Sequence, residues 1–183
     1  MTNKRFEILN QLLSGIEANI QFKDKENLSI SNSTVGWQLD HSLKVIIKVS
    51  EWTAQSNPQD HKRNFNFMRL IMFTLGYIPR GKGKAPKYVV PPEVITTEDL
   101  NNQLEIAKNQ ISILNDLPQG VYFKHFIFGM LSKKQTLRFL EIHTKHHLKI
   151  VGDILKKQKT LSVTRKSFNS LKKNVLFKLQ KAQ

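Results

Sequence analysis

The sequence contains no cysteine among its 183 residues. Disulfides, thiolate metal sites and cysteine nucleophiles are therefore excluded, and histidine and carboxylate side chains remain as candidate metal ligands. A chain without cysteine is compatible with the reducing cytoplasm, where we expect this protein to be located.

Long apolar runs are also missing, because no stretch approaches the roughly 20 residues that a membrane-spanning helix needs. The first residues, Met1 to Glu7, are mostly polar and charged and do not resemble a signal peptide. Apolar residues nevertheless make up 39% of the chain and charged residues 23%, a balance typical of folded globular proteins. We therefore predict a soluble protein that has no membrane partner.

Acidic residues are absent from the C-terminal end of the chain. Asp153 is the last of them, and nine lysines and arginines follow it, although the whole chain has 29 basic and 14 acidic residues. We predict a helical domain over residues 1–158 and a basic C-terminal extension over residues 159–183. The extension is either a solvated basic helix or a surface that binds polyanions. Nucleic acid is not the expected partner, because no recognition motif for it is present.

Apolar residues recur with a helical period in five segments, at about residues 3–19, 35–53, 59–75, 97–114 and 133–158. Residues 77–92 contain four prolines and two glycines, which forbid a long helix. Residues 115–130 have some extended character, but no convincing strand is present. We predict an all-α fold, a four-helix bundle with a long crossover connection and one more basic helix from residue 160.

Within the proline-rich segment, Gly81-Lys-Gly-Lys84 invites comparison with a phosphate-binding loop. It lacks the full Gly-x-x-x-x-Gly-Lys-Ser/Thr pattern and the strand–loop–helix setting in which that pattern works. A basic loop that crosses the molecule is the default interpretation.

Three of the six histidines lie in the last of the periodic segments. His143 and His147 are one helical turn apart, in the middle of the apolar stripe that contains Leu140 and Val151. His146 points about 100° away from that stripe. Two buried imidazoles need partners, and either a shared metal ion or hydrogen bonds to neighbouring polar groups can supply them. The spacing alone leaves both alternatives open.

A metal site would need a third ligand. His41 is the best candidate, because it lies between Trp37 and Val45 on the face of another predicted helix, and His125, in the loop before the last bundle helix, is second. No glutamate follows His143 as it does in His-Glu-x-x-His zinc proteases, so that mechanism has no base here.

Four motifs together resemble a known family. They are Trp37-Gln-Leu-Asp-His41, the segment Pro79 to Pro86 followed by Pro91-Pro92, His125-Phe-Ile-Phe-Gly129, and His143-Thr-Lys-His-His147. In order and spacing, over about residues 35–152, they resemble a little-characterised branch of the DinB-like superfamily of metal-binding four-helix bundles, the DinB/YfiT-like fold. The chain departs from that branch at Phe126, where a proline often follows the histidine.

The resemblance implies a three-histidine metal site made of His41, His143 and His147. It also implies a divalent ion, usually zinc or nickel, whose remaining positions are open to water. The activity implied is that of a metal-dependent enzyme, either a thiol-dependent transferase or one with hydrolase-type chemistry, with no catalytic residue and no small-molecule substrate specified. His125 then either supports the site or carries protons, or it only packs the loop. A homodimer is suggested by analogy alone.

An alternative from another class is a non-enzymatic binding module. In that case the histidine site is structural, and the basic extension docks an acidic partner.

Overall fold

The computed structural model describes the backbone of residues 2–81 and 85–180 and the side chains of residues 4–81 and 85–156. This part of the chain is mostly helical. Its helices are α1 (Thr2–Asn19), α2 (Val35–Ala54), α3 (Phe67–Leu75), α4 (Thr97–Asp116) and α5 (Lys133–Gln180). Short 3-10 turns lie at Ile20–Phe22, Pro58–Asp60 and Lys87–Val89. Strands β1 (Tyr122–His125) and β2 (Gly129–Ser132) form an antiparallel hairpin.

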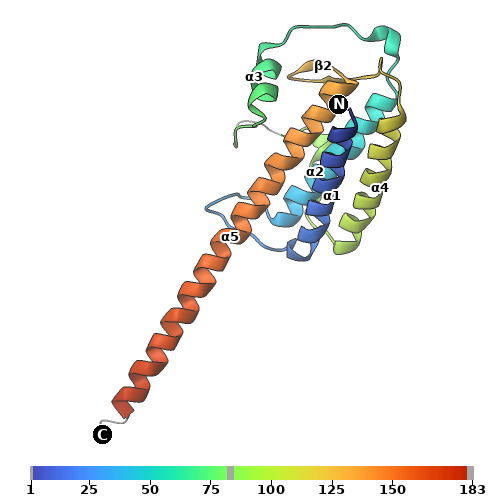
Figure 1. Cartoon of the computed structure of the whole chain (residues 1–183). Coiled ribbons are helices and arrows are strands. Elements are labelled where there is room, and N and C mark those ends of the chain that lie inside the picture. Colours follow the sequence, from blue (N-terminus) through green and yellow to red (C-terminus); the bar gives the residue numbers. More distant parts are fainter. Residues whose placement is uncertain (1, 82–84, 181–183) are drawn as a thin grey trace.

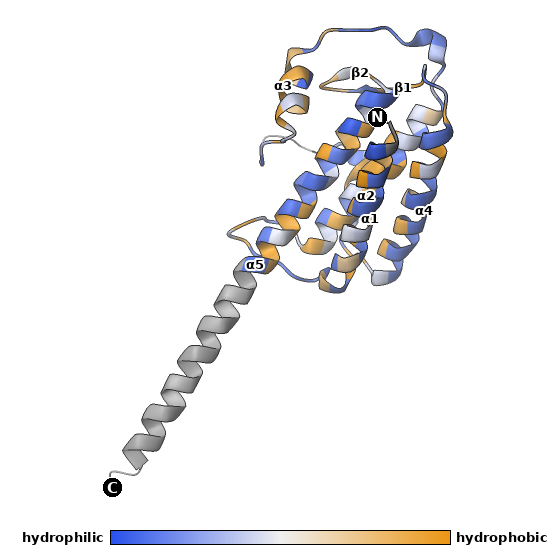
Figure 2. Ribbon diagram, viewed as in Figure 1, coloured by the Kyte–Doolittle hydropathy of each residue, from blue (hydrophilic) through white to orange (hydrophobic). Residues whose placement is uncertain are grey.

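The helices pack around one shared core. Helices α1 and α2 both contact α4 and α5, and α3 lies against α5 near the end of the molecule that carries the hairpin (Figure 1). The buried apolar residues of α1, α2, α4 and α5 form this core, whereas most apolar residues of α3 are exposed; Figure 2 shows where the apolar residues lie along each helix. Removal of these apolar side chains from water is the main force that holds the helices together.

Helices α2 and α4 begin at the residues that the sequence predicts. The side chain of Thr34 accepts a hydrogen bond from the backbone N–H of Trp37 at the start of α2. Thr96 and Asp99 form a reciprocal capping box at the start of α4. These bonds satisfy N–H groups that have no partner within the helix.

The third helix is shorter than predicted, because α3 begins at Phe67 and not near Gln59. The Asn66 side chain accepts a hydrogen bond from the Arg69 backbone N–H at 2.8 Å and so caps the helix. The Arg69 guanidinium also donates to the backbone and side-chain oxygens of Asn64. These bonds hold the chain before Phe67 outside the helix.

The prediction of an all-α fold without strands is wrong in one place, the β1–β2 hairpin. Phe123 and His125 turn their side chains inward, and the neighbouring Lys124 is exposed. The chain reverses before Gly129, which adopts a φ of 70°. Each strand has only four residues, too few for their alternation to stand out in the sequence.

Helix α5 continues past its predicted end at Gln158 as far as Gln180, in one piece. No proline or glycine lies between Gly152 and that end, so nothing in the sequence interrupts the helix. The division at residue 158 stays a prediction. Lys82, Gly83 and Lys84 of the suggested phosphate loop lie outside the described residues. In the part of the chain that is described, no helix is both long and apolar enough to cross a bilayer.

Candidate metal centre

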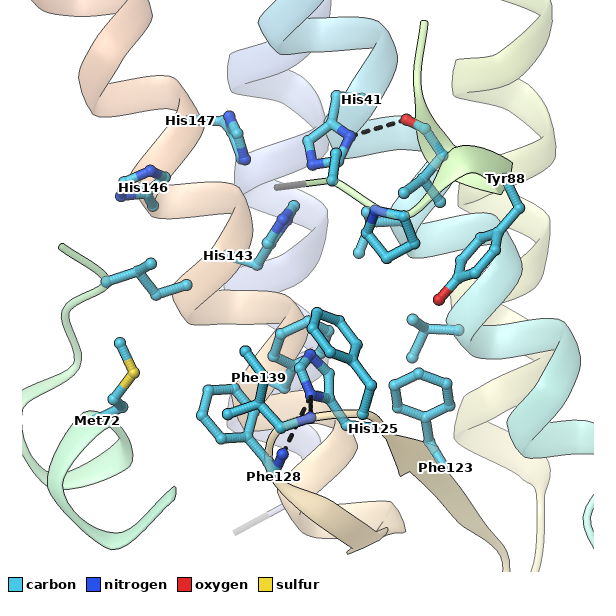
Figure 3. Close-up of a pocket in the computed structure, with 18 of the residues that line it drawn as sticks. His41, Met72, Tyr88, Phe123, His125, Phe128, Phe139, His143, His146 and His147 are labelled. Atoms are coloured by element: carbon cyan, nitrogen blue, oxygen red, sulfur yellow. Dashed lines mark hydrogen bonds between the residues drawn. The ribbon is translucent and has the colours of Figure 1, made fainter. Parts of the chain in front are cut away.

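Helices α2 and α5 bring three histidines together inside the molecule. His41 comes from α2, and His143 and His147 come from adjacent turns of α5. One nitrogen from each lies within 4.8 Å of the others. Their ring centroids are 5.1 Å apart for His41 and His143, 4.8 Å for His41 and His147, and 4.5 Å for His143 and His147 (Figure 3).

The ring of His41 is held by one hydrogen bond and one stacking contact. Its Nδ1–H donates to the carbonyl oxygen of Val89 at 2.8 Å. Trp37, one turn earlier in α2, stacks on the ring with a centroid distance of 5.0 Å. Because a carbonyl oxygen can only accept, the proton lies on Nδ1 and the lone pair lies on Nε2.

His147 is fixed in the same way by a side chain of α2. Its Nδ1–H donates to Oε1 of Gln38 at 2.6 Å, and the amide nitrogen of Gln38 donates to Oγ of Ser31 at 3.3 Å. Gln38 is a site residue that was not predicted from the sequence. The available indication was its position three residues before His41, which places both side chains on neighbouring parts of one helix face.

His143 supplies the orphaned group of the cluster. Its Nδ1 is buried and has no hydrogen-bond partner among the described residues. A buried polar nitrogen without a partner is costly. One nitrogen of His143 also lies within 4.8 Å of a nitrogen of each of the other two rings, so the three residues present fit a metal ion.

Burial keeps all three imidazoles neutral. It lowers the pKa of His41, and together with the neighbouring imidazoles it lowers the pKa values of His143 and His147 well below the ordinary value. Neutral imidazole is the form that binds metals. Nitrogens around a tetrahedral zinc ion lie about 3.4 Å apart, and the nitrogens of this cluster lie within 4.8 Å of one another.

Carboxylates take no part in the cluster. Asp40 lies 2.6 Å from Nζ of Lys44 and accepts a hydrogen bond from Gln103. Glu141 is paired with three basic side chains, those of Arg5, Arg138 and Lys145. The two acidic residues are therefore engaged with other side chains, and the donor set consists of imidazoles.

His125 lies outside the cluster, at the end of β1. Its Nδ1 accepts hydrogen bonds from the backbone N–H groups of Ile127 at 3.0 Å and Phe128 at 3.2 Å. The ring stacks against Phe126 and Phe128 at centroid distances of 4.6 and 4.5 Å. Burial lowers the pKa of His125 to about 4. At neutral pH the ring is therefore uncharged, with its proton on Nε2.

His146 is half-buried, and its ring centroid lies 5.0 Å from that of His147, but it is not one of the three histidines that form the cluster. It hydrogen-bonds the backbone of Ile78, and burial and the nearby Arg80 lower its pKa.

The cluster opens into a cavity of about 450 Å³. Its walls come from α2, α3, α5, the hairpin and the described parts of the segment before α4, residues 78–81 and 85–89 (Figure 3). Apart from the histidines, the lining is almost entirely aliphatic and aromatic: Trp37, Val45, Val49, Trp52, Met68, Met72, Ile78, Pro79, Gly81, Ala85, Pro86, Tyr88, Val89, Phe123, Phe126, Ile127, Phe128 and Phe139. His125 and His146 line the same cavity, so five histidines face one space.

The fold and site define a mostly helical protein whose buried three-histidine cluster can hold a metal ion. The chain belongs to the family described as protein of unknown function (DUF1569), whose model matches residues 28–153. The match includes His41, His125, His143 and His147 together with the segment that joins α2 to α4. Neither a curated protein nor a solved structure matches the chain.

Proposed function

We propose that this protein binds a divalent metal ion, zinc or nickel, through His41, His143 and His147 and uses it to transform a small molecule held in the cavity. The observation that carries the proposal is the state of the three rings. Two of them have Nδ1 bound to an oxygen acceptor, which leaves Nε2 free, and the third has a buried nitrogen without a partner.

The order of the motifs along the chain supports membership of the DinB-like superfamily. In this proposal α1, α2, α4 and α5 are the bundle helices, and the long connection between α2 and α4 is the crossover. One histidine from an early helix and a His-x-x-x-His pair from the last helix then form the site that the resemblance implies.

A divalent ion held by three neutral imidazoles lowers the pKa of bound water towards about 7 or polarises a substrate atom. The chain itself orients the rings through Val89 and Gln38 and surrounds the site with apolar walls. Because the protein has no cysteine, a transferase reaction must use an external thiol. Hydrolase-type chemistry is the other reaction that this arrangement can serve.

His125 has a narrower role in this proposal than that of a proton carrier. With a pKa of about 4 and its Nδ1 bound to two backbone N–H groups, it cannot collect a proton at neutral pH. It can donate a hydrogen bond from Nε2, and it holds the turn of the hairpin through Nδ1.

The proposal is tested by comparing metal-free and zinc- or nickel-loaded protein prepared without a histidine tag. Each form is assayed for consumption of a small thiol in the presence of an electrophile and for hydrolysis of apolar esters. We expect turnover only in the loaded form, its loss in His143→Ala, and its retention in His61→Ala, which changes a histidine outside the cavity. Turnover that is equal in metal-free protein, or absent from both loaded forms with every substrate, contradicts the proposed enzyme.

A further inference from the structure

The described part of the cavity lining contains no charged side chain, although the chain has 29 basic and 14 acidic residues. None of the described residues that line it is a lysine, arginine, aspartate or glutamate. Arg80 lies between two lining residues, Pro79 and Gly81, but its guanidinium is paired with Asp153 at 2.6 Å. Arg80 is therefore paired with an acidic side chain and is not among the residues that line the cavity.

The polar groups that do face the cavity are also uncharged. Burial lowers the pKa of His125 to about 4 and raises the pKa of the Tyr88 phenol. Tyr88 packs edge-on against Trp52 at a centroid distance of 4.8 Å, and Trp52 stacks on Phe123 at 5.9 Å. The wall opposite the histidine cluster is thus aromatic, with hydroxyl and imidazole groups as its polar parts.

We infer that the cavity binds an uncharged, predominantly apolar small molecule whose single polar head group meets the three-histidine cluster. A charged group placed among these side chains loses its hydration and finds no opposite charge there. Each methylene that enters the cavity gains roughly fourfold in affinity. The volume of about 450 Å³ lies within the range of small-molecule pockets. The position of the head group rests on the proposed function, whereas the apolar character of the ligand rests on the lining alone.

The first test uses three hydroxamic acids that share one zinc-binding head and differ in their tails. Acetohydroxamic acid, octanohydroxamic acid and 6-aminohexanohydroxamic acid are titrated into zinc-loaded protein by calorimetry. We expect octanohydroxamic acid, whose tail has six more methylenes, to bind at least 100-fold more tightly than acetohydroxamic acid, a gain that requires about three to four of those methylenes to enter the cavity at roughly fourfold each. We expect the amino-terminated acid to gain less than threefold. Equal affinities for all three, or a full gain for the charged tail, would overturn the inference.

The second test separates the cavity from the metal. N-phenyl-1-naphthylamine, a neutral dye that fluoresces in apolar surroundings, is titrated into metal-free protein, and we expect saturable binding at one site. If the dye binds but no hydroxamic acid binds to protein incubated with zinc, the proposed metal function fails and the apolar cavity stands. If all hydroxamic acids bind equally and the dye does not bind, the metal site stands and this inference fails.

A matched pair of variants on α3 places the dye in this cavity. Met72 is partly buried and lines the cavity, whereas Leu75 is exposed and does not. We expect Met72→Glu to weaken dye binding at least tenfold and Leu75→Glu to leave it unchanged. Unchanged dye binding in folded Met72→Glu protein would overturn the assignment of the dye to this cavity. If that variant does not fold, the comparison of the three hydroxamic acids on the unaltered protein decides the inference.

Discussion

At the residue scale, two hydrogen bonds determine which nitrogens of the cluster are available to an ion. Val89 and Gln38 each accept the Nδ1 proton of one histidine, which leaves the Nε2 lone pair free. Groups that orient metal-binding histidines in this way commonly matter nearly as much as the ligands themselves. Gln38 is a side chain, so its contribution can be removed by substitution.

The variant Gln38→Met keeps a similar volume but removes the acceptor for His147. We expect the affinity for zinc to fall by about 10- to 100-fold, because the ring loses the bond that fixes its orientation. Competition with a chelator of known affinity measures the change. The control is Gln103→Met, which removes another amide near α2, one that bonds Asp40 and no histidine. An equal loss in both variants contradicts the role given to Gln38.

A second prediction at this scale concerns pH. Because the pKa of His125 is about 4 in the folded protein and about 6.5 in the unfolded chain, the unfolded chain takes up the proton first as the pH falls. Below about pH 6.5 His125 therefore destabilises the fold, by about 2 kcal/mol at pH 5 compared with pH 7.

The variant His125→Asn isolates this contribution, since the Asn side-chain oxygen can accept the same two backbone N–H bonds without titrating. Urea unfolding of metal-free wild-type and variant proteins at pH 7 and pH 5 gives the comparison. The wild type should lose about 2 kcal/mol more than the variant between the two pH values. Equal losses show that His125 is not buried as a neutral ring.

At the scale of elements, a buried arginine joins α3 to the hairpin. The Arg69 guanidinium donates to the carbonyl oxygens of Phe128 at 3.0 Å and Met130 at 2.9 Å, and to Asn64 in the chain before α3. Both elements supply walls of the cavity. Arg69 therefore acts on the site indirectly, by fixing the position of those walls.

Replacement of Arg69 should loosen the cavity walls that α3 and the hairpin supply, without affecting the metal ligands. We expect Arg69→Met to lower the free energy of unfolding by about 3 kcal/mol, because several buried oxygens lose their donor. Zinc affinity should change less than threefold. Arg63→Met, at an exposed position of the same segment, should stay within about 0.5 kcal/mol of wild type. If Arg69→Met lowers the free energy of unfolding no more than this control does, the hydrogen bonds of Arg69 are not important for stability.

How well each element could be predicted from the sequence depended on its length and regularity. Helices α1, α2 and α4 have long apolar stripes or capping residues. The residues within or next to each of these helices therefore indicate where it lies. The hairpin is bound to α3 by Arg69, whose partners in the hairpin lie up to 61 residues away along the chain. No local pattern contains that information.

Some parts of the candidate site could likewise be predicted from the sequence, and others could not. The pair His143 and His147 follows from helical spacing, and the resemblance names His41. By contrast, the Val89 acceptor comes from a proline-rich segment 48 residues after its histidine, so only the folded chain reveals the contact. The apolar cavity likewise becomes visible only when α3, the hairpin and the described parts of the segment before α4 are placed together.

At the scale of the whole molecule, the cavity with its histidine cluster and the basic C-terminal extension lie in different parts of the sequence. The cavity has no charged residue among its described lining, whereas residues 159–183 carry seven of the chain's 29 lysines and arginines. We propose that the basic extension can bind polyanions independently of the histidine cluster.

Deletion of residues 159–183 lowers the formal net charge from +15 to +8. We expect the shortened protein to elute from heparin at a clearly lower salt concentration, because fewer counterions are released on binding. Its zinc content should be unchanged. Heparin binding that survives the deletion at moderate salt contradicts the role of the extension, and loss of zinc contradicts its independence from the cluster.

The most direct test of the account is anomalous X-ray scattering at the zinc edge from crystals of zinc-loaded protein prepared without a histidine tag. We predict one strong peak per chain, about 2.0–2.1 Å from a nitrogen of each of His41, His143 and His147. Absence of a peak between these three residues, in crystals of protein that contains stoichiometric zinc, would contradict the account.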